Sequence, residues 1–307
     1  MDQKSEFPLL KLPYLALKGV LKKMEPLDVI HLSKTSKTCN SRVRGFKRYE
    51  YECILSIHEN PYLTVSSAGQ PNYIPLFLET QKNQSSLKQL VEEMENIRAV
   101  LNIKVETLKL DMGFCESESK FFVDWLKQYY PVIGRAELTG NTVSHGDLEY
   151  FLKEIRITDS VTLGVETDEK KKVEIPKNLR RFHVANGDWI GLEQFMKMDC
   201  AEMRLRNTSL TRRDVQQFLK SWKVSRCHQN LKSLCLTMKT VENSNPKKEI
   251  ERLMSSLNPN GFLLNTRRND FEHLLFSNTD GKVASFKTHA NRKSVSISFT
   301  VLNGTGR

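Results

Sequence analysis

The sequence predicts an α+β protein in which a small helical N-terminal segment precedes an irregular domain of strands and helices that ends in a β-hairpin. Apolar residues recur every three or four positions within the first fifty residues, which is the helical period. Short runs of alternating apolar and polar residues follow, and an Asp-Gly pair stands between two such runs near the C-terminus. The 307 residues, 39% of them hydrophobic and 27% charged, are enough for about two folded domains.

The N-terminal segment is expected to form two or three short helices. An apolar stripe runs along the first of them and consists of Ala16, Leu17, Val20, Leu21 and Met24. Pro26 ends this helix and suits the first position of a second one, where proline loses no needed hydrogen-bond donor. Leu27 and Ile30 supply the apolar side of the second helix. A bundle of about 45 residues buries little surface alone, so its surplus of apolar residues predicts a partner.

From about residue 54 onward, the pattern predicts strands alternating with helices. Alternation of apolar and polar residues predicts strands at 105–110, around 137–138, and at 161–165, 180–184, 202–206 and 231–238. Helical spacing predicts helices at 121–129, 147–155, 192–198 and 214–222. Asp280 and Gly281 predict a tight hairpin turn with positive φ, and residues 294–302 predict a further strand.

Two of these strand-helix units align without a gap. Residues 137–153 and 204–220 correspond at a constant offset of 67, which pairs Leu138 with Leu205. A looser signature, an apolar pair followed by lysine, ends four predicted helices at spacings of 26, 44 and 23 residues. These periods and the L-x-L strands resemble leucine-rich-repeat units, in which each unit buries its apolar face against its neighbours. The sequence therefore predicts a short, irregular, leucine-rich-repeat-like array.

The N-terminal segment resembles the F-box, and the resemblance covers residues 7–53. Its features are the opening Leu12 and Pro13, an apolar helix ending at Met24, the turn from Pro26 to Asp28, the apolar Val29, Ile30 and Leu32, and the closing Ser36 and Lys37. Cys39 and Asn40 stand where this family usually carries an aromatic residue.

The order of the whole chain resembles the large nematode F-box family that carries a type 2 F-box-associated domain. This resemblance implies an F-box at 7–53 and a substrate-recruitment domain at 54–302. It also implies a non-catalytic substrate-recognition subunit of an SCF-type cullin-RING ubiquitin ligase. The F-box would bind a Skp-type adaptor, and through it a cullin, while the C-terminal domain recruits an unidentified target protein. The residues expected to contact the adaptor or to support the F-box core, with both roles open, are Leu12, Pro13, Leu17, Val20, Leu21, Leu27 and Ile30.

The chain is basic, and one segment carries most of the excess. The formal net charge is +11, and residues 170–232 hold 15 Lys and Arg against 6 Asp and Glu. Arg204 and Arg206 share the exposed face of one predicted strand, and Arg180 and Arg181 lie on the strand before it. These four arginines predict a substrate-binding cluster suited to a carboxylate-rich or phosphorylated peptide. A merely solvated basic face is the alternative.

No arrangement in the sequence predicts catalysis, a metal site or a cofactor. There is no G-x-S-x-G elbow, no H-E-x-x-H pair and no glycine-rich phosphate loop. Cys227 and His228 are adjacent and point in different directions, which makes a poor catalytic dyad. The six cysteines lie far apart and are expected to be buried free thiols. We therefore expect a protein that is not an enzyme.

The composition favours an intracellular protein of the cytoplasm or nucleus. No apolar run approaches the roughly 18 residues that span a bilayer, and the first residues do not resemble a secretory signal. Membrane binding is not expected. Nucleic acid is not an expected partner, because the basic segment lacks interleaved aromatic residues. Two alternatives stay open: a basic-surface module that binds nucleic acid or acidic proteins without a ligase role, and a family member that folds but recruits nothing.

Overall fold

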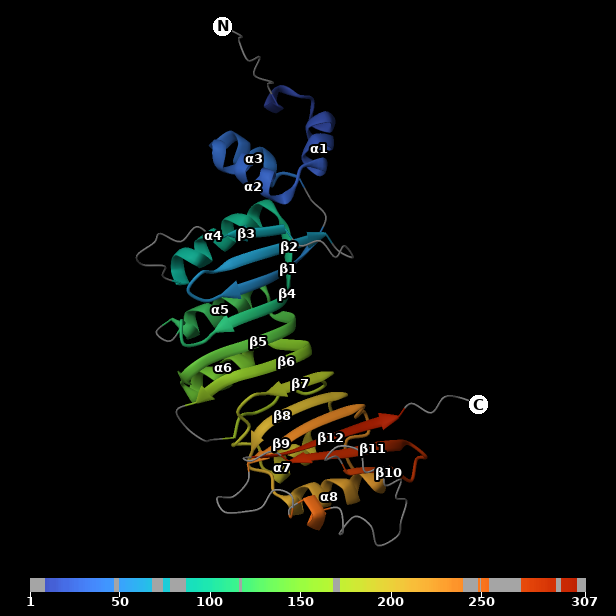
Figure 1. The fold of residues 1–307 in the computed structure, drawn as a ribbon. Helices are drawn as coiled ribbons and strands as arrows, with labels where there is room; N and C mark the ends of the chain where they lie inside the picture. The colour runs from blue at the N-terminus through green and yellow to red at the C-terminus, as the bar shows by residue number, and fades with distance from the viewer. Residues whose placement is uncertain are drawn as a thin grey trace. The chain divides into compact units, whose positions relative to one another are not determined.

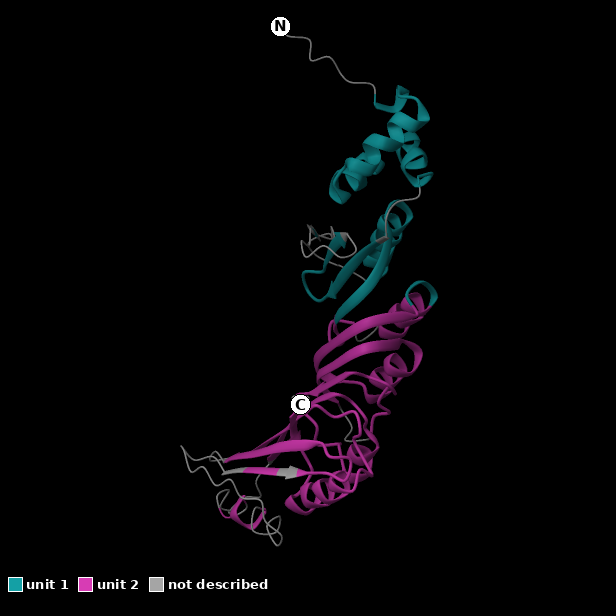
Figure 2. Cartoon of the chain, turned by 90° about the vertical axis from the view of Figure 1, so that its right-hand side faces the viewer, with its two compact units in different colours: residues 1–109, 128–130 teal, residues 110–127, 131–307 magenta. Residues whose placement is uncertain are grey.

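The described part of the chain divides into two compact units (Figures 1 and 2). Unit 1 comprises residues 1–109 and 128–130, and unit 2 comprises residues 110–127 and 131–307. The computed structural model describes residues 9–46, 50–67, 74–77, 87–115, 118–167, 172–239, 248, 250–253, 272–290 and 294–302.

Unit 1 begins with short helices whose limits follow from a proline and a serine cap. A 3-10 turn, η1 (Leu9–Lys11), precedes α1 (Tyr14–Lys23), α2 (Pro26–Thr35) and α3 (Lys37–Arg44). Pro26 is the first residue of α2, as the sequence predicts, because this position needs no backbone donor. The hydroxyl of Ser36 accepts a hydrogen bond from the backbone N–H of Cys39 and so caps α3.

A small sheet and one long helix complete unit 1. Its elements are β1 (Glu50–Ile57), β2 (Tyr62–Ser67), β3 (Ile74–Phe77), α4 (Leu87–Val100) and β4 (Asn102–Asp111), which reaches unit 2 with its last two residues. The strand order is β4-β1-β2-β3, with β1, β2 and β3 antiparallel. Helices α2 and α3 pack against α4, where Lys34 Nζ lies 2.7 Å from Glu93 Oε1. The N-terminal helices are therefore joined to the rest of unit 1 through α2 and α3.

Unit 2 contains the strand-helix alternation that the sequence predicts. Its elements are α5 (Ser119–Tyr129), β5 (Val132–Val143), α6 (His145–Glu154), β6 (Arg156–Thr167), β7 (Arg181–Val184), α7 (Leu192–Lys197), β8 (Glu202–Thr208), α8 (Arg212–Lys223), β9 (Ser233–Lys239), β10 (Glu272–Ser277), β11 (Val283–Ala290) and β12 (Ser294–Leu302). The last two residues of α5 belong to unit 1. The strand order is β10-β11-β12-β9-β8-β7-β6-β5. Neighbours from β5 to β9 pair in parallel, and β9, β12, β11 and β10 pair antiparallel.

Helices α5 to α8 lie on one face of the unit 2 sheet (Figures 1 and 2). On that face, side chains in register across seven strands form one buried row: Ala136, Val161, Phe182, Met203, Leu234, Phe299 and Phe286. Phe195 of α7 and Phe218 of α8 pack over this layer with ring centroids 5.2 Å apart. Because the helices cover a single face, the alternate residues of the described strands are left on the other, open face.

The two units that align in sequence have equivalent places in unit 2. Leu138 and Leu205 are both buried strand residues, and Phe151 and Phe218 are both buried on the helices that follow. Asn207 Nδ2, at a bulge in β8, donates to the backbone oxygen of Ala185. The repeated pattern therefore corresponds to a repeated structural unit, although the likeness to leucine-rich repeats itself stays a prediction.

The C-terminal hairpin forms where the sequence predicts it, but its turn is longer than a two-residue turn. Residues 279–281 connect β10 to β11 between Asn278 and Lys282, and the Asn278 N–H donates to the Lys282 oxygen at 3.0 Å. Gly281 has φ 78°, whereas Asp280 is not in the left-handed region. A three-residue loop needs one left-handed residue and a type I′ turn needs two, which explains the difference.

Five cysteines are buried, as expected, and the sixth is not. Cys39, Cys53, Cys115, Cys200 and Cys227 are buried, and Cys235 is exposed; all six are free. The expectation of a buried Cys235 is wrong because this residue alternates with Leu234 and Leu236 and lies on the open face of β9. None of the helices in the described ranges has the length and apolarity needed to cross a membrane.

Candidate functional site

Helix α1 has two groups of apolar side chains, one buried in the core of unit 1 and the other exposed. Leu17 and Leu21, one turn apart, are 1% and 2% exposed. Leu15 is 78% exposed and Val20 is 39% exposed, although both are aliphatic. At about 100° per residue, Leu15 lies opposite the buried pair and Val20 lies at its flank. Helix α1 therefore exposes apolar side chains on more than one side outside the packed core. We call Tyr14, Leu15, Ala16 and Val20 the α1 outer face.

The seven residues predicted to contact the adaptor or to support the F-box core fall into three groups. Leu17, Leu21 and Ile30 are buried, Leu12 and Leu27 are half-buried, and Pro13 and Val20 are exposed. In this chain the first group supports the packing of the helices. Sequence reasoning missed Leu15 and Tyr14, and the signal that would have found Leu15 is an apolar residue lying off the predicted stripe.

A second candidate surface is the open face of β7, β8 and β9. The described residues on this face are Arg181 and His183 of β7, Glu202, Arg204 and Arg206 of β8, and Ser233, Cys235 and Thr237 of β9. His183 is in register with Arg204, and Arg204 is in register with Cys235. Arg204 and Arg206 are exposed, as the sequence predicts, and neither makes an ion pair with another described residue.

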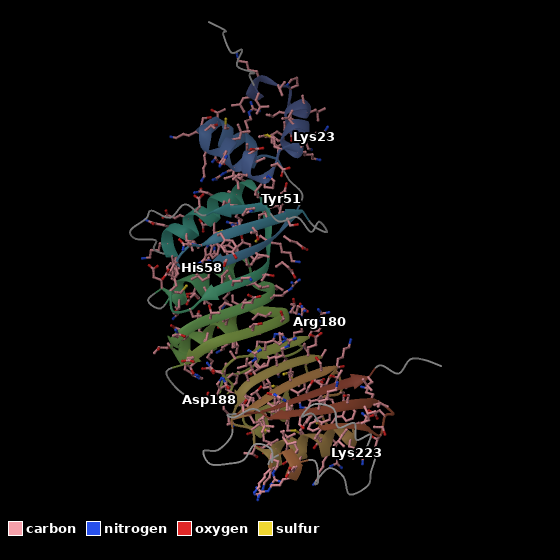
Figure 3. All side chains as sticks on the ribbon, in the orientation of Figure 1. Lys23, Tyr51, His58, Arg180, Asp188 and Lys223 are labelled. Atoms are coloured by element: carbon pink, nitrogen blue, oxygen red, sulfur yellow. The ribbon has the colours of Figure 1, made fainter. Side chains whose placement is uncertain are left out.

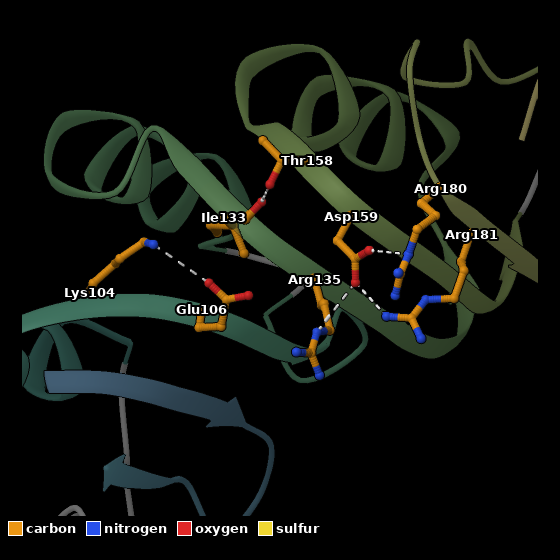
Figure 4. A network of polar contacts seen from close by, with 8 residues as sticks. All are labelled: Lys104, Glu106, Ile133, Arg135, Thr158, Asp159, Arg180 and Arg181. Atoms are coloured by element: carbon orange, nitrogen blue, oxygen red, sulfur yellow. Dashed lines mark hydrogen bonds and ion pairs between the residues drawn. The ribbon is translucent and has the colours of Figure 1, made fainter. Parts of the chain in front are cut away.

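Three guanidinium groups surround one carboxylate beside this face (Figure 4). Asp159 lies near the start of β6, and its two carboxylate oxygens lie 2.9 Å from Arg180 Nε and 3.5 Å from Arg135 Nε. The carboxylate also accepts a hydrogen bond from Arg181 Nη2. The backbone N–H of Arg180 also donates to the backbone carbonyl oxygen of Asp159 at 3.0 Å. Arg180, which the sequence predicts on the same strand as Arg181, precedes β7, and the structure places the carboxylate of Asp159 between the two guanidinium groups.

Charges on this surface shift the pKa of two side chains. Partial burial alone raises the pKa of Asp159, but the hydrogen bond from Arg181 and the charges of Arg181, Arg180 and Arg135 outweigh it and lower that pKa. The pKa of His183 is lowered by burial first and then by the charge of Arg204; Glu202 opposes this, and Arg181 and Arg206 have smaller lowering effects. Asp159 is therefore held ionised, and the arginines make the surroundings of His183 positive.

A hollow of about 810 Å³ adjoins this cluster at Arg180 (labelled in Figure 3). Its charged lining residues are Lys177, Arg180, Lys197 and Lys232 on the basic side and Glu174 and Asp199 on the acidic side. The carboxylate of Asp199 accepts hydrogen bonds from the backbone N–H and the side-chain amide of Asn230. The basic character of the open face therefore continues into this hollow.

Cys227 and His228 lack the environment of an activated thiol. Burial raises the pKa of Cys227 to about 11 and lowers that of His228 to about 4. The His228 ring lies 4.9 Å from the ring of Phe195 and 5.1 Å from that of Phe218. The histidine is thus a component of an aromatic core, and across the described ranges no cluster of His, Cys, Asp and Glu could hold a metal ion.

Comparison with known families assigns two segments of the chain. Residues 9–51, which include α1, α2 and α3, match the F-box domain. Residues 173–236, which include β7, β8 and most of β9, match the family described as F-box associated. The chain therefore contains an F-box domain and an F-box-associated domain. No curated protein and no solved structure matches it.

These two domains define the class of protein. An F-box domain together with an F-box-associated domain is typical of proteins of ubiquitin ligase complexes that act through protein-protein interaction. The two candidate surfaces lie within the two matched segments: the α1 outer face in the F-box, and the open face of β7 to β9 in the F-box-associated segment.

Proposed function

We propose that this chain is a substrate-recognition subunit of an SCF-type cullin-RING ubiquitin ligase. The F-box binds a Skp-type adaptor, which connects it to a cullin, and the remainder of the chain recruits a target protein. The chain contributes proximity to the ligase rather than reacting groups. We also propose the domain limits 7–53 and 54–302, a cytoplasmic or nuclear location and a place in the nematode F-box family.

The observation that carries this proposal is the exposure of apolar side chains on α1. Leu15 and Val20 lie outside the packed core of unit 1, in a segment that matches the F-box domain. Burial of apolar area contributes roughly 25 cal/mol per Å², and exposed apolar patches on a folded domain mark sites where another protein binds. Pro13 and half-buried Leu12, beside α1, extend this surface.

Co-purification of the full chain with a Skp-type adaptor tests the proposal. We expect the double variant Leu15→Glu and Val20→Glu to abolish adaptor recovery, because both charges enter an apolar interface without partners. Replacement of Leu12 and Pro13 by alanine is expected to have the same effect. Thermal unfolding should change little, since Leu15 and Val20 are not part of the core.

Val283 provides a matched control. It is 39% exposed, like Val20, and lies in unit 2 on β11. Val283→Glu should therefore leave adaptor recovery at the level of the unchanged chain. Recovery that is equal for the double variant, the control and the unchanged chain contradicts the adaptor-binding role.

A second candidate function is a basic-surface module that binds nucleic acid or acidic proteins without a ligase role. The observation in its favour is the unpaired state of Arg204 and Arg206 among the described residues. Salt separates the two functions. Binding to phosphates weakens steeply between about 50 and 200 mM salt, whereas an apolar adaptor interface responds little.

A further inference from the structure

The open face of β7 to β9 and the carboxylate of Asp159 together have the features of an anion-binding surface. We propose that Arg204 and Arg206 bind acidic side chains of an extended segment of the target protein, and that Asp159 restrains Arg180 and Arg181 from binding the same segment. This inference rests on the proposed function, because the segment belongs to the protein that the chain recruits. It adds the chemical class of that segment and a residue that controls its affinity.

The charge of the face supports an anionic partner. Its described positions on the three strands carry three arginines, Arg181, Arg204 and Arg206, against the single carboxylate of Glu202. Arginine presents a fork of donors that suits carboxylates and phosphates alike. His183 lies on β7, in register with Arg204, and its buried Nε2 has no hydrogen-bond partner. The exposed donors of this face that no described carboxylate pairs are the guanidinium groups of Arg204 and Arg206.

The spacing of the arginines fits an extended protein chain. Arg204 and Arg206 are two residues apart on one strand, so their side chains emerge about 6.6 Å from each other. Alternate side chains of an extended peptide have the same separation. Most open-face residues on β6, β9 and β12 are short and hydroxylated, and the exposed Glu166, which accepts a hydrogen bond from Asn186, is an acidic exception on β6. The short residues are Ser160, Thr162, Ser233, Cys235, Thr237, Ser296, Ser298 and Thr300.

These neighbours favour a peptide over a nucleic acid. Small side chains allow the backbone of a bound segment to approach the sheet closely. Proteins that bind single-stranded nucleic acid stack its bases on aromatic side chains. The described open-face positions of β7, β8 and β9 hold no Phe, Tyr or Trp, and their one aromatic ring is the half-buried imidazole of His183.

Asp159 limits how many guanidinium groups are available to bind an anionic partner. It makes contacts with Arg135, Arg180 and Arg181, and its side chain is 26% exposed. An incoming anion competes with this carboxylate for Arg180 and Arg181, but it meets no such competitor at Arg204 and Arg206. Removal of the charge at residue 159 should therefore strengthen binding, and removal of the charges at 204 and 206 should weaken it.

Binding of three peptides to the full chain, measured by fluorescence anisotropy, tests the proposal. The peptides have one sequence with glutamate, phosphoserine or glutamine at alternate positions. We expect the glutamate peptide, the phosphoserine peptide or both to bind, which identifies carboxylate or phosphate as the source of the charge, and the glutamine peptide not to bind. The double variant Arg204→Gln and Arg206→Gln should lose binding by on the order of tenfold or more, and Asp159→Asn should gain several-fold.

Arg213→Gln is the matched control, because Arg213 is an exposed arginine on α8, in the layer of helices. It should leave peptide affinity unchanged. An equal loss for Arg213→Gln and for the variant at 204 and 206 overturns the site, and weaker binding by Asp159→Asn overturns the restraint. An RNA oligonucleotide that binds more tightly than either acidic peptide, with the same dependence on Arg204 and Arg206, overturns the choice of a protein partner.

Cys235 gives a readout that needs no variant. It is the exposed one of the six cysteines and is in register with Arg204. A bound acidic peptide should slow alkylation of Cys235, and alkylation that proceeds at the same rate with and without peptide contradicts binding at this face. Failure of this inference leaves adaptor recovery and its dependence on Leu15 and Val20 unchanged. Failure of the proposed function appears instead as adaptor recovery that is absent or does not respond to the Leu15→Glu and Val20→Glu variant, whatever the peptide affinity.

Discussion

The ring of Tyr14, at the start of α1, lies 5.0 Å from the ring of Phe46, two residues beyond the end of α3. This contact joins the first and last helices of the F-box segment. Phe46 is buried, whereas Tyr14 is more than half exposed. Phe46 thus provides a buried aromatic contact to α1 from the chain that follows α3.

Removal of the Phe46 ring should destabilise the N-terminal helices. We expect Phe46→Ala to cost about 3 kcal/mol, because it opens a cavity between α1 and α3. Hydrogen exchange of the amides in α1 would measure this loss. Phe121→Ala is the control, since Phe121 is 40% exposed and should cost far less. Equal protection of α1 in both variants would show that Phe46 does not hold the helices together.

The stability of the chain should fall in mild acid because of His228. Burial lowers its pKa to about 4 in the folded chain, with a smaller opposing effect of Asp199, against an ordinary value of 6.5. The unfolded chain therefore binds more protons between these two values. The contribution of neutral His228 is complete above pH 6.5 and is lost as the pH falls toward 4, for a total of about 3 kcal/mol.

Urea unfolding at several pH values measures this dependence. His228→Asn should flatten it, and asparagine also tolerates the φ of 51° at this position. His31→Asn, at an exposed position on α2, should leave the dependence unchanged. A slope that His228→Asn does not reduce would assign the acid sensitivity to other groups.

Gly140 is expected to tolerate no side chain, whereas Gly19 should benefit from one. Gly140 has φ 139°, and a Cβ there would lie 2.9 Å from the backbone nitrogen of Gly113. Gly140→Ala should therefore cost about 1–3 kcal/mol. Gly19 lies within α1 with no atom near its missing Cβ, so Gly19→Ala should add about 0.5–1 kcal/mol. Opposite changes in thermal midpoint are the expected result.

Helices α8 and α6 occupy equivalent places in the two aligned units, but removal of the hydroxyl of the residue that precedes each helix should destabilise them to different extents. Thr211 and Asp214 form a reciprocal capping box at the start of α8, while Ser144 makes no side-chain cap at α6. Thr211→Ala should cost about 1 kcal/mol, and Ser144→Ala should cost little. Chemical denaturation of the two variants provides the comparison, and an equal loss would contradict the role of the cap.

The sequence predicts the elements of this fold well where local chemistry decides them. Pro26 marks the start of α2, and the helical spacing of Val215, Phe218, Leu219 and Trp222 marks α8, because both signals act within one turn of helix. The alternation in β8 likewise predicts the exposed Arg204 and Arg206. In each of these cases the residues concerned are near one another in the chain.

The candidate surfaces are predicted less completely, because they depend on contacts between distant residues. Asp159 meets Arg180 and Arg181 only through the parallel register of β6 and β7, which the sequence does not encode locally. In the F-box segment, the apolar stripe identifies buried Leu17 and Leu21, because periodicity detects the face that packs. Leu15 lies off this stripe, so the periodicity of apolar residues does not identify it.

Because helices cover only one face of the unit 2 sheet, substitutions on the open face can change what the chain binds with little effect on its stability. Residues on the uncovered side of β6 to β9 are mainly serine, threonine and arginine, and exchanges among such surface residues alter stability by about 0.5 kcal/mol or less. A few substitutions on one side of the sheet can therefore change what this surface binds, while the hydrophobic layer beneath stays constant.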